Sequence, residues 1–366
     1  MLEYFWKKIL RRKGISLWHI PALVMWVLSL LFWPISVFHR GRKRDQLKLS
    51  LPVISVGNIT VGGSGKTPLV ELIASELLND NIRVGIVSSG YKRLTTDSFI
   101  APGYKVQTMD VDQTGDEIML LAHLVPNAVF SVASRKSEAA LKLADSNLVD
   151  VIVVDDGFQH QSLARDIDIV TFDAAVARRK LRMFPYGVLR EPLSALKHAE
   201  VIIITRANVA KDITGLQRRL KKEINPSAEY FSAHFKSDEL IGRSQTMPVK
   251  YLDDKAVFLF AGVGSFAALQ KQVVSLSGNL VGYYEFSDHQ IYTPSILEKI
   301  KKQAEKRKAE VIVTTGKDWV KLGGFDFGRE IYFLNLVLDL NPSEEHLTRF
   351  LKSQLQLGSL KGPERY

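Results

Sequence analysis

The glycine-rich segment at residues 60–67, TVGGSGKT, carries residue types that bind nucleotide phosphates. An apolar run at 51–58, predicted to be a strand, precedes it, and an amphipathic stretch at 68–78, predicted to be a helix, follows. A phosphate-binding loop requires this context. Backbone N–H groups and the positive helix end would hold the phosphates, Lys66 would reach the terminal phosphates and the Thr67 hydroxyl would face Mg²⁺. The expected nucleotide-binding residues are Thr60, Val61, Gly62, Gly63, Ser64, Gly65, Lys66 and Thr67.

The loop departs from the strict pattern at its first position. Thr60 stands where the pattern G-x-x-x-x-G-K-[ST] begins with glycine. Gly62, Gly63 and Gly65 still leave the backbone free to approach a phosphate group closely. We therefore expect the loop to bind a nucleoside triphosphate in spite of this change.

Two adjacent carboxylates, Asp155 and Asp156, lie near the end of an apolar run at 149–157, about 90 residues beyond the loop. Taken alone, an acid pair at a strand end is commonplace. In P-loop proteins, however, an acid at this point holds the metal ion, directly or through water. Together with the loop, the pair predicts a triphosphate–Mg²⁺ site whose metal-binding residues are Thr67, Asp155 and Asp156.

Four polar segments near predicted strand or helix ends could bind a second substrate. Asp116 opens a helix predicted over 116–124 and could place a carboxylate near the γ-phosphate. Residues 157–160, GFQH, directly follow the two acids, and residues 181–193 form an irregular loop rich in Gly, Pro and Arg. His289 lies just past a predicted strand.

Plainer interpretations of these side chains stay open. Asp116 could only place a negative charge at a helix N-terminus. His289 could be an ordinary loop histidine, and His160 a packing residue. Arg190 could pair with Glu191 or another neighbouring acid.

The elements that must position these residues follow from the alternation of apolar and helical segments. Near-continuous apolar strands separated by helices indicate a parallel sheet covered on both faces, with ligands at the carboxyl ends of the strands. We predict an α/β fold in which a P-loop NTPase-type core domain spans 46–240 and a smaller α/β domain spans 250–366. The remaining strands are predicted at 83–88, 128–132, 166–172, 199–205, 256–262, 280–286, 310–315 and 330–338, with helices at 134–148 and 299–308.

Composition excludes several classes of protein. The 366 residues include no cysteine, which removes disulfide frameworks, cysteine-ligated metals and thiol catalysis. The net charge of +10 lies mainly in residues 1–48, which hold ten Lys or Arg and two acids. The other 318 residues hold 39 basic and 37 acidic side chains. We therefore expect no nucleic-acid partner, because no excess of positive charge spreads over a folded face.

An apolar N-terminal segment separates two clusters of basic residues. Residues 14–39 contain no Asp, Glu, Lys or Arg, and five basic residues lie on each side. Pro21 and Pro34 leave only 12 uninterrupted positions, which favours a monotopic or re-entrant element over a spanning helix. We predict that segment 1–45 holds a helix that binds an anionic membrane surface. Three tryptophans would suit the headgroup level: Trp18, Trp26 and Trp33.

With these motifs in place, the chain resembles a known family, the tetraacyldisaccharide 4′-kinases (lipid A 4′-kinases) of Gram-negative bacteria. The resemblance covers nearly the whole chain, and Thr60 is itself a feature of the family. It implies ATP-dependent phosphorylation of the 4′-hydroxyl of an acylated glucosamine disaccharide phosphate, in lipid A biosynthesis, at the cytoplasmic face of the bacterial inner membrane. The motifs are VGNITVGGSGKTP at 56–68, GDE at 115–117, DDGFQH at 155–160, PYGVLREP at 185–192 and DH at 288–289.

The resemblance also implies roles for individual side chains. Asp116 would accept or orient the proton of the sugar hydroxyl, with His289 from the second domain as its partner. Arg190 would stabilise charge or bind substrate, and Lys66 would act on the transferred phosphoryl group. ATP and Mg²⁺ would be the cofactors, with Asp155 and Asp156 as the Mg²⁺ acids.

One position departs from the family's pattern. The family usually reads SRGYGR where this chain has SSGYKR, so that Ser89 replaces an arginine. Lys92 or Arg93 could compensate for the lost positive charge.

Two other functions stay open from the sequence. One is a membrane-attached nucleotide switch that acts on a protein partner, and the other is a soluble P-loop enzyme with a small-molecule substrate. A switch would carry an Asn-Lys-x-Asp sequence that specifies the base. The nearest candidate, TGKD at 315–318, has the wrong spacing, which lowers the first of these alternatives.

Overall fold

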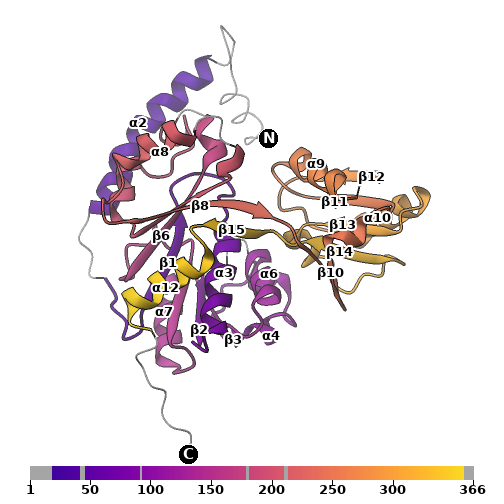
Figure 1. Ribbon diagram of the computed structural model, residues 1–366, viewed down its shortest axis with the longest axis horizontal. Helices are drawn as coiled ribbons and strands as arrows, with labels where there is room; N and C mark the ends of the chain where they lie inside the picture. Colours follow the sequence, from indigo (N-terminus) through magenta and orange to yellow (C-terminus); the bar gives the residue numbers. More distant parts are fainter. Residues whose placement is uncertain are drawn as a thin grey trace, which may run out of the picture.

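The computed structural model describes residues 19–41, 46–90, 93–178, 181–209, 213–277 and 279–357. Figure 1 shows two α/β parts joined by two neighbouring strands. Within the described ranges, the larger sheet has nine strands in the order β15-β8-β7-β6-β1-β5-β2-β4-β3. Its strands are β1 (Val53–Asn58), β2 (Val84–Ser88), β3 (Phe99–Pro102), β4 (Val129–Val132), β5 (Val151–Asp155), β6 (Ile167–Asp173), β7 (Val201–Thr205), β8 (Glu229–Lys236) and β15 (Val337–Asn341).

The larger sheet is parallel except at its edges. The seven strands from β8 to β4 run parallel, whereas β15 and β3 pair antiparallel at the two ends. Every residue of β1, β5, β6 and β7 is buried, which explains their near-continuous apolar sequences. The predicted P-loop NTPase-type α/β fold is confirmed. The helices of this part are α3 (Lys66–Asn79), α4 (Gly103–Val106), α5 (Val111–Thr114), α6 (Asp116–Leu124), α7 (Lys136–Asp145), α8 (Ile213–Lys221) and α12 (Glu344–Leu355).

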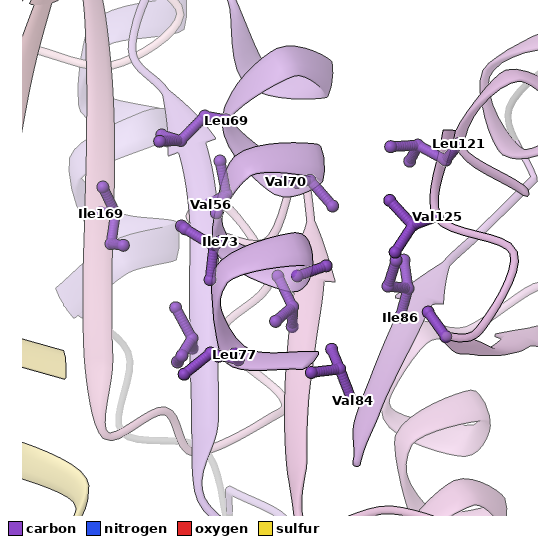
Figure 2. Packing of buried hydrophobic residues seen from close by; sticks show 14 of the residues in the cluster. Val56, Leu69, Val70, Ile73, Leu77, Val84, Ile86, Leu121, Val125 and Ile169 are labelled. Atoms are coloured by element: carbon purple, nitrogen blue, oxygen red, sulfur yellow. The ribbon is translucent and has the colours of Figure 1, made fainter. Parts of the chain in front are cut away.

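Helix α3 anchors the phosphate-binding loop to the sheet. Leu69, Ile73 and Leu77 recur at helical spacing on one face, and each is fully buried or nearly so. Figure 2 shows these side chains between the helix and the strands, beside Val56 of β1. Full burial of a leucine or isoleucine side chain stabilises a fold by about 2 kcal/mol. The start of α3 is therefore held rigidly at the end of β1.

The smaller sheet belongs to a second domain, residues 239–334, which the chain enters from β8 and leaves toward β15. Within the described ranges this sheet has six strands, in the order β10-β9-β14-β13-β11-β12. The strands are β9 (Glu239–Ile241), β10 (Thr246–Pro248), β11 (Val257–Ala261), β12 (Leu280–Glu285), β13 (Val311–Thr314) and β14 (Glu330–Leu334). The helices are α9 (Phe266–Ser277), α10 (Pro294–Lys306) and α11 (Gly316–Trp319).

Two antiparallel strand pairs connect the domains, and we call them together the linker ribbon. Strand β8 pairs with β15 in the larger sheet, and β9 pairs with β14 in the smaller one. Between the pairs, the Asn335 N–H donates to the carbonyl of Glu239 at 3.0 Å. The sheets therefore divide differently from the predicted boundaries, because 337–355 returns to the larger sheet and 239–248 already belongs to the smaller one.

Helix α2 (His19–Gly41) runs without a break through Pro34, whereas the sequence predicts an interruption there. Pro21 lies in the first turn, where a backbone N–H has no partner within the helix, and Pro34 removes a single hydrogen bond from 23 residues. Across the described part of the chain, no helix combines the length and apolar character needed to cross a membrane. Trp18 and the rest of residues 1–18 lie outside the described residues. Membrane association of segment 1–45 stays a prediction.

Glu71 of α3 lies half-buried beside the linker ribbon. Burial raises the pKa of its carboxyl to about 7, and the negative charge of Glu239 adds to this effect. Asn335 donates a hydrogen bond that favours the ionised form and opposes part of the rise. The folded protein therefore holds a proton at Glu71 between about pH 4.5 and 7 that the unfolded chain releases. The stability from this site is complete below about pH 4.5 and is lost as the pH rises through 7.

We predict that Glu71→Gln makes the free energy of unfolding less sensitive to pH between 5 and 8. At pH 8 the free energy of unfolding of the variant should exceed that of the wild type by about 2 kcal/mol, because the variant buries no charge at this position. Urea unfolding at pH 5, 6, 7 and 8 measures this difference. Glu298→Gln removes an exposed carboxylate of α10 and is the control. Equal pH slopes for Glu71→Gln and wild type would contradict the assignment.

Candidate active site

The phosphate-binding loop turns sharply between β1 and α3. Gly65 precedes the helix with φ 87°, a left-handed conformation that favours glycine. A Cβ atom at Gly65 would also lie 2.9 Å from Cζ of Phe235. Gly62 has φ 115° and open space around it. The two positions need glycine for the shape of the turn, and the open side leaves room for a ligand.

Ser64 and Thr60 hold the loop in place from below. Ser64 is buried, and its hydroxyl lies 2.8 Å from both the Asn58 amide nitrogen and the Thr171 hydroxyl. The Thr205 hydroxyl donates to the Ser64 carbonyl at 3.1 Å. Thr60 pairs with Leu189 and does not adopt a positive φ, which explains why glycine is not needed there. Ser64 therefore fixes the conformation of the loop through its hydroxyl and its carbonyl.

Asp155 ends β5 and Asp156 follows it at the carboxyl edge of the sheet, as the sequence predicts. Asp155 is 3% exposed, and among the described residues its Oδ1 has no hydrogen-bond partner. Asp156 has φ 50°, and its two oxygens face basic side chains. One oxygen lies 3.4 Å from Lys66 Nζ, and the other lies 3.6 Å from Arg190 Nη1. The structure thus brings the loop lysine, the acid pair and the predicted arginine together.

Lys136 is a buried basic residue that the sequence analysis did not single out. It is 4% exposed, and its Nζ donates to the backbone carbonyl of Asp156 at 2.7 Å. Burial lowers the pKa of Lys136, and the charges of Asp155 and Asp156 oppose this effect. Its position four residues after the predicted strand at 128–132, near the start of the predicted helix at 134–148, was the only available signal.

The two acids differ in proton affinity although they are adjacent. Burial raises the pKa of Asp155 to about 6, and the negative charge of Glu117 contributes to the rise. Burial also opposes ionisation of Asp156, but the charges of Lys66, Lys136 and Arg190 hold the pKa of that carboxyl below its usual range. Asp156 therefore stays ionised as a neutral solution is made mildly acidic, whereas Asp155 takes up a proton as the pH falls through about 6.

Asp116 and His289 meet across the two domains. His289 Nδ1 lies 3.1 Å from Asp116 Oδ2, which is the pairing that the resemblance implies. Asp116 is buried at the first position of α6, after Gly115 with φ 86°. His289 adopts φ 59°, an uncommon conformation for a residue other than glycine. Among the described residues, Asp116 Oδ1 has no hydrogen-bond partner.

The donor set fits a magnesium ion. Hard divalent cations bind oxygen ligands, and Mg²⁺ takes one or two carboxylates together with substrate phosphates and water. Asp155 Oδ1 is a buried carboxylate oxygen without a donor in the described structure, and Thr67 lies in the first turn of α3. No group of three or more His, Asp or Glu side chains gathers as a metal site within the described ranges. This arrangement suits a metal that arrives with a nucleotide.

The segment around Ser89 holds the position at which the family usually has an arginine. Ser89 is half-buried directly after β2. The Arg93 guanidinium donates to the carbonyls of Thr96 and Asp97 in its own loop. Lys92 lies outside the described residues. Arg93 therefore holds its loop and does not take the place of the expected arginine among the contacts that the structure records.

The segments predicted to bind a second substrate lie against the phosphate-binding loop. The Arg190 N–H donates to the carbonyl of Ile59 at 2.8 Å. The Gln159 side chain donates to the carbonyl of Asn58 at 2.6 Å. Segments 157–160 and 181–193 thus each contact the stretch that leads from β1 into the loop.

Comparisons with known proteins agree with this geometry. A family model described as tetraacyldisaccharide-1-P 4′-kinase matches residues 21–356. The tetraacyldisaccharide 4′-kinase of Desulfotalea psychrophila is 33% identical over 82% of this chain and 88% of its own length. The enzyme of that name from Pelobacter propionicus is 33% identical over 79% of each chain.

A solved structure extends the likeness to three dimensions. LpxK from Aquifex aeolicus, crystallised in complex with ATP, superposes with a TM-score of 0.73 at 28% identity. The match covers 91% of this chain and 99% of that chain. The sequence relatives and this structure agree over both domains, and the chain therefore belongs to the tetraacyldisaccharide-1-phosphate 4′-kinase family.

Proposed function

We propose that the chain transfers the γ-phosphate of ATP to the 4′-hydroxyl of a tetraacyldisaccharide 1-phosphate, a step of lipid A biosynthesis. Membership of the family supports the reaction and the substrate class. The observation that carries the proposal is the Asp116–His289 pair, in which the core domain supplies the carboxylate and the second domain supplies the histidine. A carboxylate–histidine pair beside a triphosphate cradle is suited to activating a hydroxyl group.

In this proposal the nucleotide is held mainly by the core domain. Backbone N–H groups of the loop bind the phosphates, and Lys66 moves from Asp156 toward the γ-phosphate. Asp155, Asp156 and Thr67 would hold Mg²⁺, which neutralises negative charge on the β- and γ-phosphates. Arg190 stabilises charge on the transferred group, and its contact with Asp156 keeps it near that position.

Asp116 acts on the acceptor. Phosphoryl transfer depends on positioning and charge neutralisation, so that a carboxylate need only orient the hydroxyl and take its proton late. Asp116 Oδ2 is held by His289, which leaves Oδ1 to accept a hydrogen bond from the sugar hydroxyl. Because His289 comes from the second domain, the pair forms only when the domains are together, which limits transfer to water.

The N-terminal segment would keep the enzyme at the surface that holds its substrate. Each buried CH₂ of an acyl chain adds about 0.8 kcal/mol to the cost of leaving a bilayer, so that the acceptor stays in the membrane. The described part of α2 exposes apolar side chains to solvent, as such a surface contact needs. These side chains include Ile20, Leu23, Val24, Val27, Leu28, Leu30 and Leu31. We place the enzyme at the cytoplasmic face of the inner membrane, where ATP is present.

The switch and the soluble-enzyme alternatives are not favoured. The TGKD sequence at 315–318 supplies the N-cap and the first three residues of helix α11. The Thr315 side chain accepts a hydrogen bond from the Asp318 N–H. Asp318 is fully buried and accepts from the Gly262 N–H at 2.9 Å, so it is committed to the second domain and does not face a base. The family match gives the chain a lipid acceptor.

The function is tested by incubating the full chain with γ-labelled ATP and a tetraacyldisaccharide 1-phosphate in detergent micelles. Label should appear in the lipid, and its yield should require both substrates. Release of phosphate without labelled lipid, stimulated by an added protein, would favour the switch and overturn the proposal.

We predict that Asp116→Ala lowers turnover about 100- to 10,000-fold, because the acceptor proton loses its base. The affinity for ATP should change less than about threefold, since Asp116 does not touch the loop. Asp116→Asn keeps the shape of the side chain and should be similarly slow. Asp112→Asn changes an exposed acid just before α6 and should match the wild type. Full activity in Asp116→Ala would remove this residue from the mechanism.

We predict that the apparent affinity for Mg²⁺ falls as the pH drops through about 6, because protons then compete at Asp155. Titration of Mg²⁺ against a fluorescent ATP analogue at pH 5, 6, 7 and 8 measures this effect. Asp155→Asn should bind Mg²⁺ more weakly and lose the part of the pH dependence that is due to the protein. The same pH dependence in both proteins would assign it to the nucleotide alone.

We predict that the double substitution Leu23→Asp and Leu31→Asp in α2 releases the protein from vesicles of phosphatidylglycerol. ATP binding should not change, because these side chains are 60% exposed and lie far along the chain from the loop. Sedimentation with vesicles measures binding, and asparagine at both positions separates charge from polarity. Unchanged sedimentation would assign membrane binding to another surface.

A further inference from the structure

Helix α11 of the second domain packs directly against α6, the helix that begins with Asp116. Met119 and Leu120 of α6 share a buried cluster with Val320 and Phe333. The rings of His123 and Trp319 meet edge to face at 5.1 Å between centroids. A Cβ atom at Gly316 would lie 2.6 Å from Leu120 Cδ1, so a larger first residue of α11 would displace the Leu120 side chain.

Lys317 of α11 reaches the residue beside the catalytic carboxylate. Its Nζ donates to Oε1 of Glu117, the second residue of α6. The Lys317 charge also interacts with Asp116 and Asp155. Burial opposes ionisation of the amine, yet Glu117 outweighs it and raises the pKa of Lys317. The second domain thus contributes a positive charge at the N-terminal end of α6, whereas Lys66, Lys136 and Arg190 come from the core domain.

Lys321, two residues beyond the end of α11, holds the loop that carries His289. Asp318 is fully buried, and its Oδ1 accepts from Lys321 Nζ at 3.0 Å. Lys321 Nζ also donates to the carbonyl of Gln290 at 3.0 Å and lies 5.3 Å from the Tyr292 ring centroid. His289 has a left-handed backbone conformation. The next residue, Gln290, accepts the hydrogen bond from Lys321, which holds the loop on the C-terminal side of His289.

We propose that α11 and the two residues after it, segment 316–321, are the positioning element of the Asp116–His289 pair, and that Lys317 is the positioning residue that couples domain contact to the reaction. Lys317 fixes the α6 end through Glu117, while Lys321 fixes the His289 loop through Gln290. One short segment thereby sets the 3.1 Å contact between the two members of the pair. The consequence for turnover rests on the proposed kinase function, but the consequence for domain position does not.

The first part of the test measures the relative position of the two domains and needs no substrate. Because the chain has no cysteine, Asp145→Cys and Lys302→Cys can be spin-labelled selectively on exposed positions of the two domains. Double electron–electron resonance should give a narrow distance distribution in this background. Adding Lys317→Gln should broaden it, whereas Lys306→Gln, which alters an exposed lysine of α10, should not.

The kinetic arm separates positioning from general damage. Lys317→Gln should lower kcat about 10- to 100-fold, since small misplacements of reacting groups are costly, with KM for ATP within about threefold of wild type. Lys317→Arg should restore most of the rate because it keeps the pair with Glu117. In a His289→Ala background, Lys317→Gln should lower kcat by less than about threefold, because no pair is left to align.

The outcomes are distinguishable. Unchanged kcat and an unchanged distance distribution in Lys317→Gln would overturn the inference, as would a full additional loss in the His289→Ala background. A broadened distribution in a protein that labels no lipid would instead support the positioning role and overturn the proposed kinase function.

Discussion

A dense group of buried negative charges is the constraint on which the rest of the site depends. Three carboxylates interact electrostatically at the edge of the larger sheet, a fourth acts with two of them on the same lysine, and a triphosphate would add further charge. A buried charge without a partner costs several kcal/mol, so that basic groups must be brought to it. The carboxylates are Asp116, Glu117, Asp155 and Asp156, and the basic side chains are Lys66, Lys136, Arg190 and Lys317.

No single element could deliver these opposing charges. The carboxyl ends of parallel strands supply the acid pair, and the loop before α3 supplies the lysine that meets it. Helix α6 lies on the side of the core domain that faces the second domain (Figure 1), and its first two residues are acidic. Contact between the domains therefore pairs Lys317 with Glu117 and His289 with Asp116 at the same end of α6.

Sequence patterns predicted the buried parts of this fold well and its edges poorly. Strands buried on both faces, such as β5, were found because their apolar runs have few alternatives. The short strands β9 and β10 are half-exposed, and the sequence pattern predicted no strand at either position. The run at 330–338 was expected to be one strand, but it bends at Asn335 from one sheet into the other. In the site, motif residues next to strand ends were identified, whereas Lys136 was not, because its contact depends on packing between distant segments.

The linker ribbon has a consequence for how the chain is organised. Lys236, the last residue of β8, pairs with Val337, the first residue of β15, so the second domain leaves and re-enters the larger sheet at adjacent points. It is topologically an insertion into a hairpin. The entropic cost of closing a loop grows only logarithmically with its length. An insert of about a hundred residues therefore destabilises the hairpin little more than a long turn would. Excising the insert and joining the two strands with a tight turn would leave an uninterrupted nucleotide-binding scaffold without its histidine.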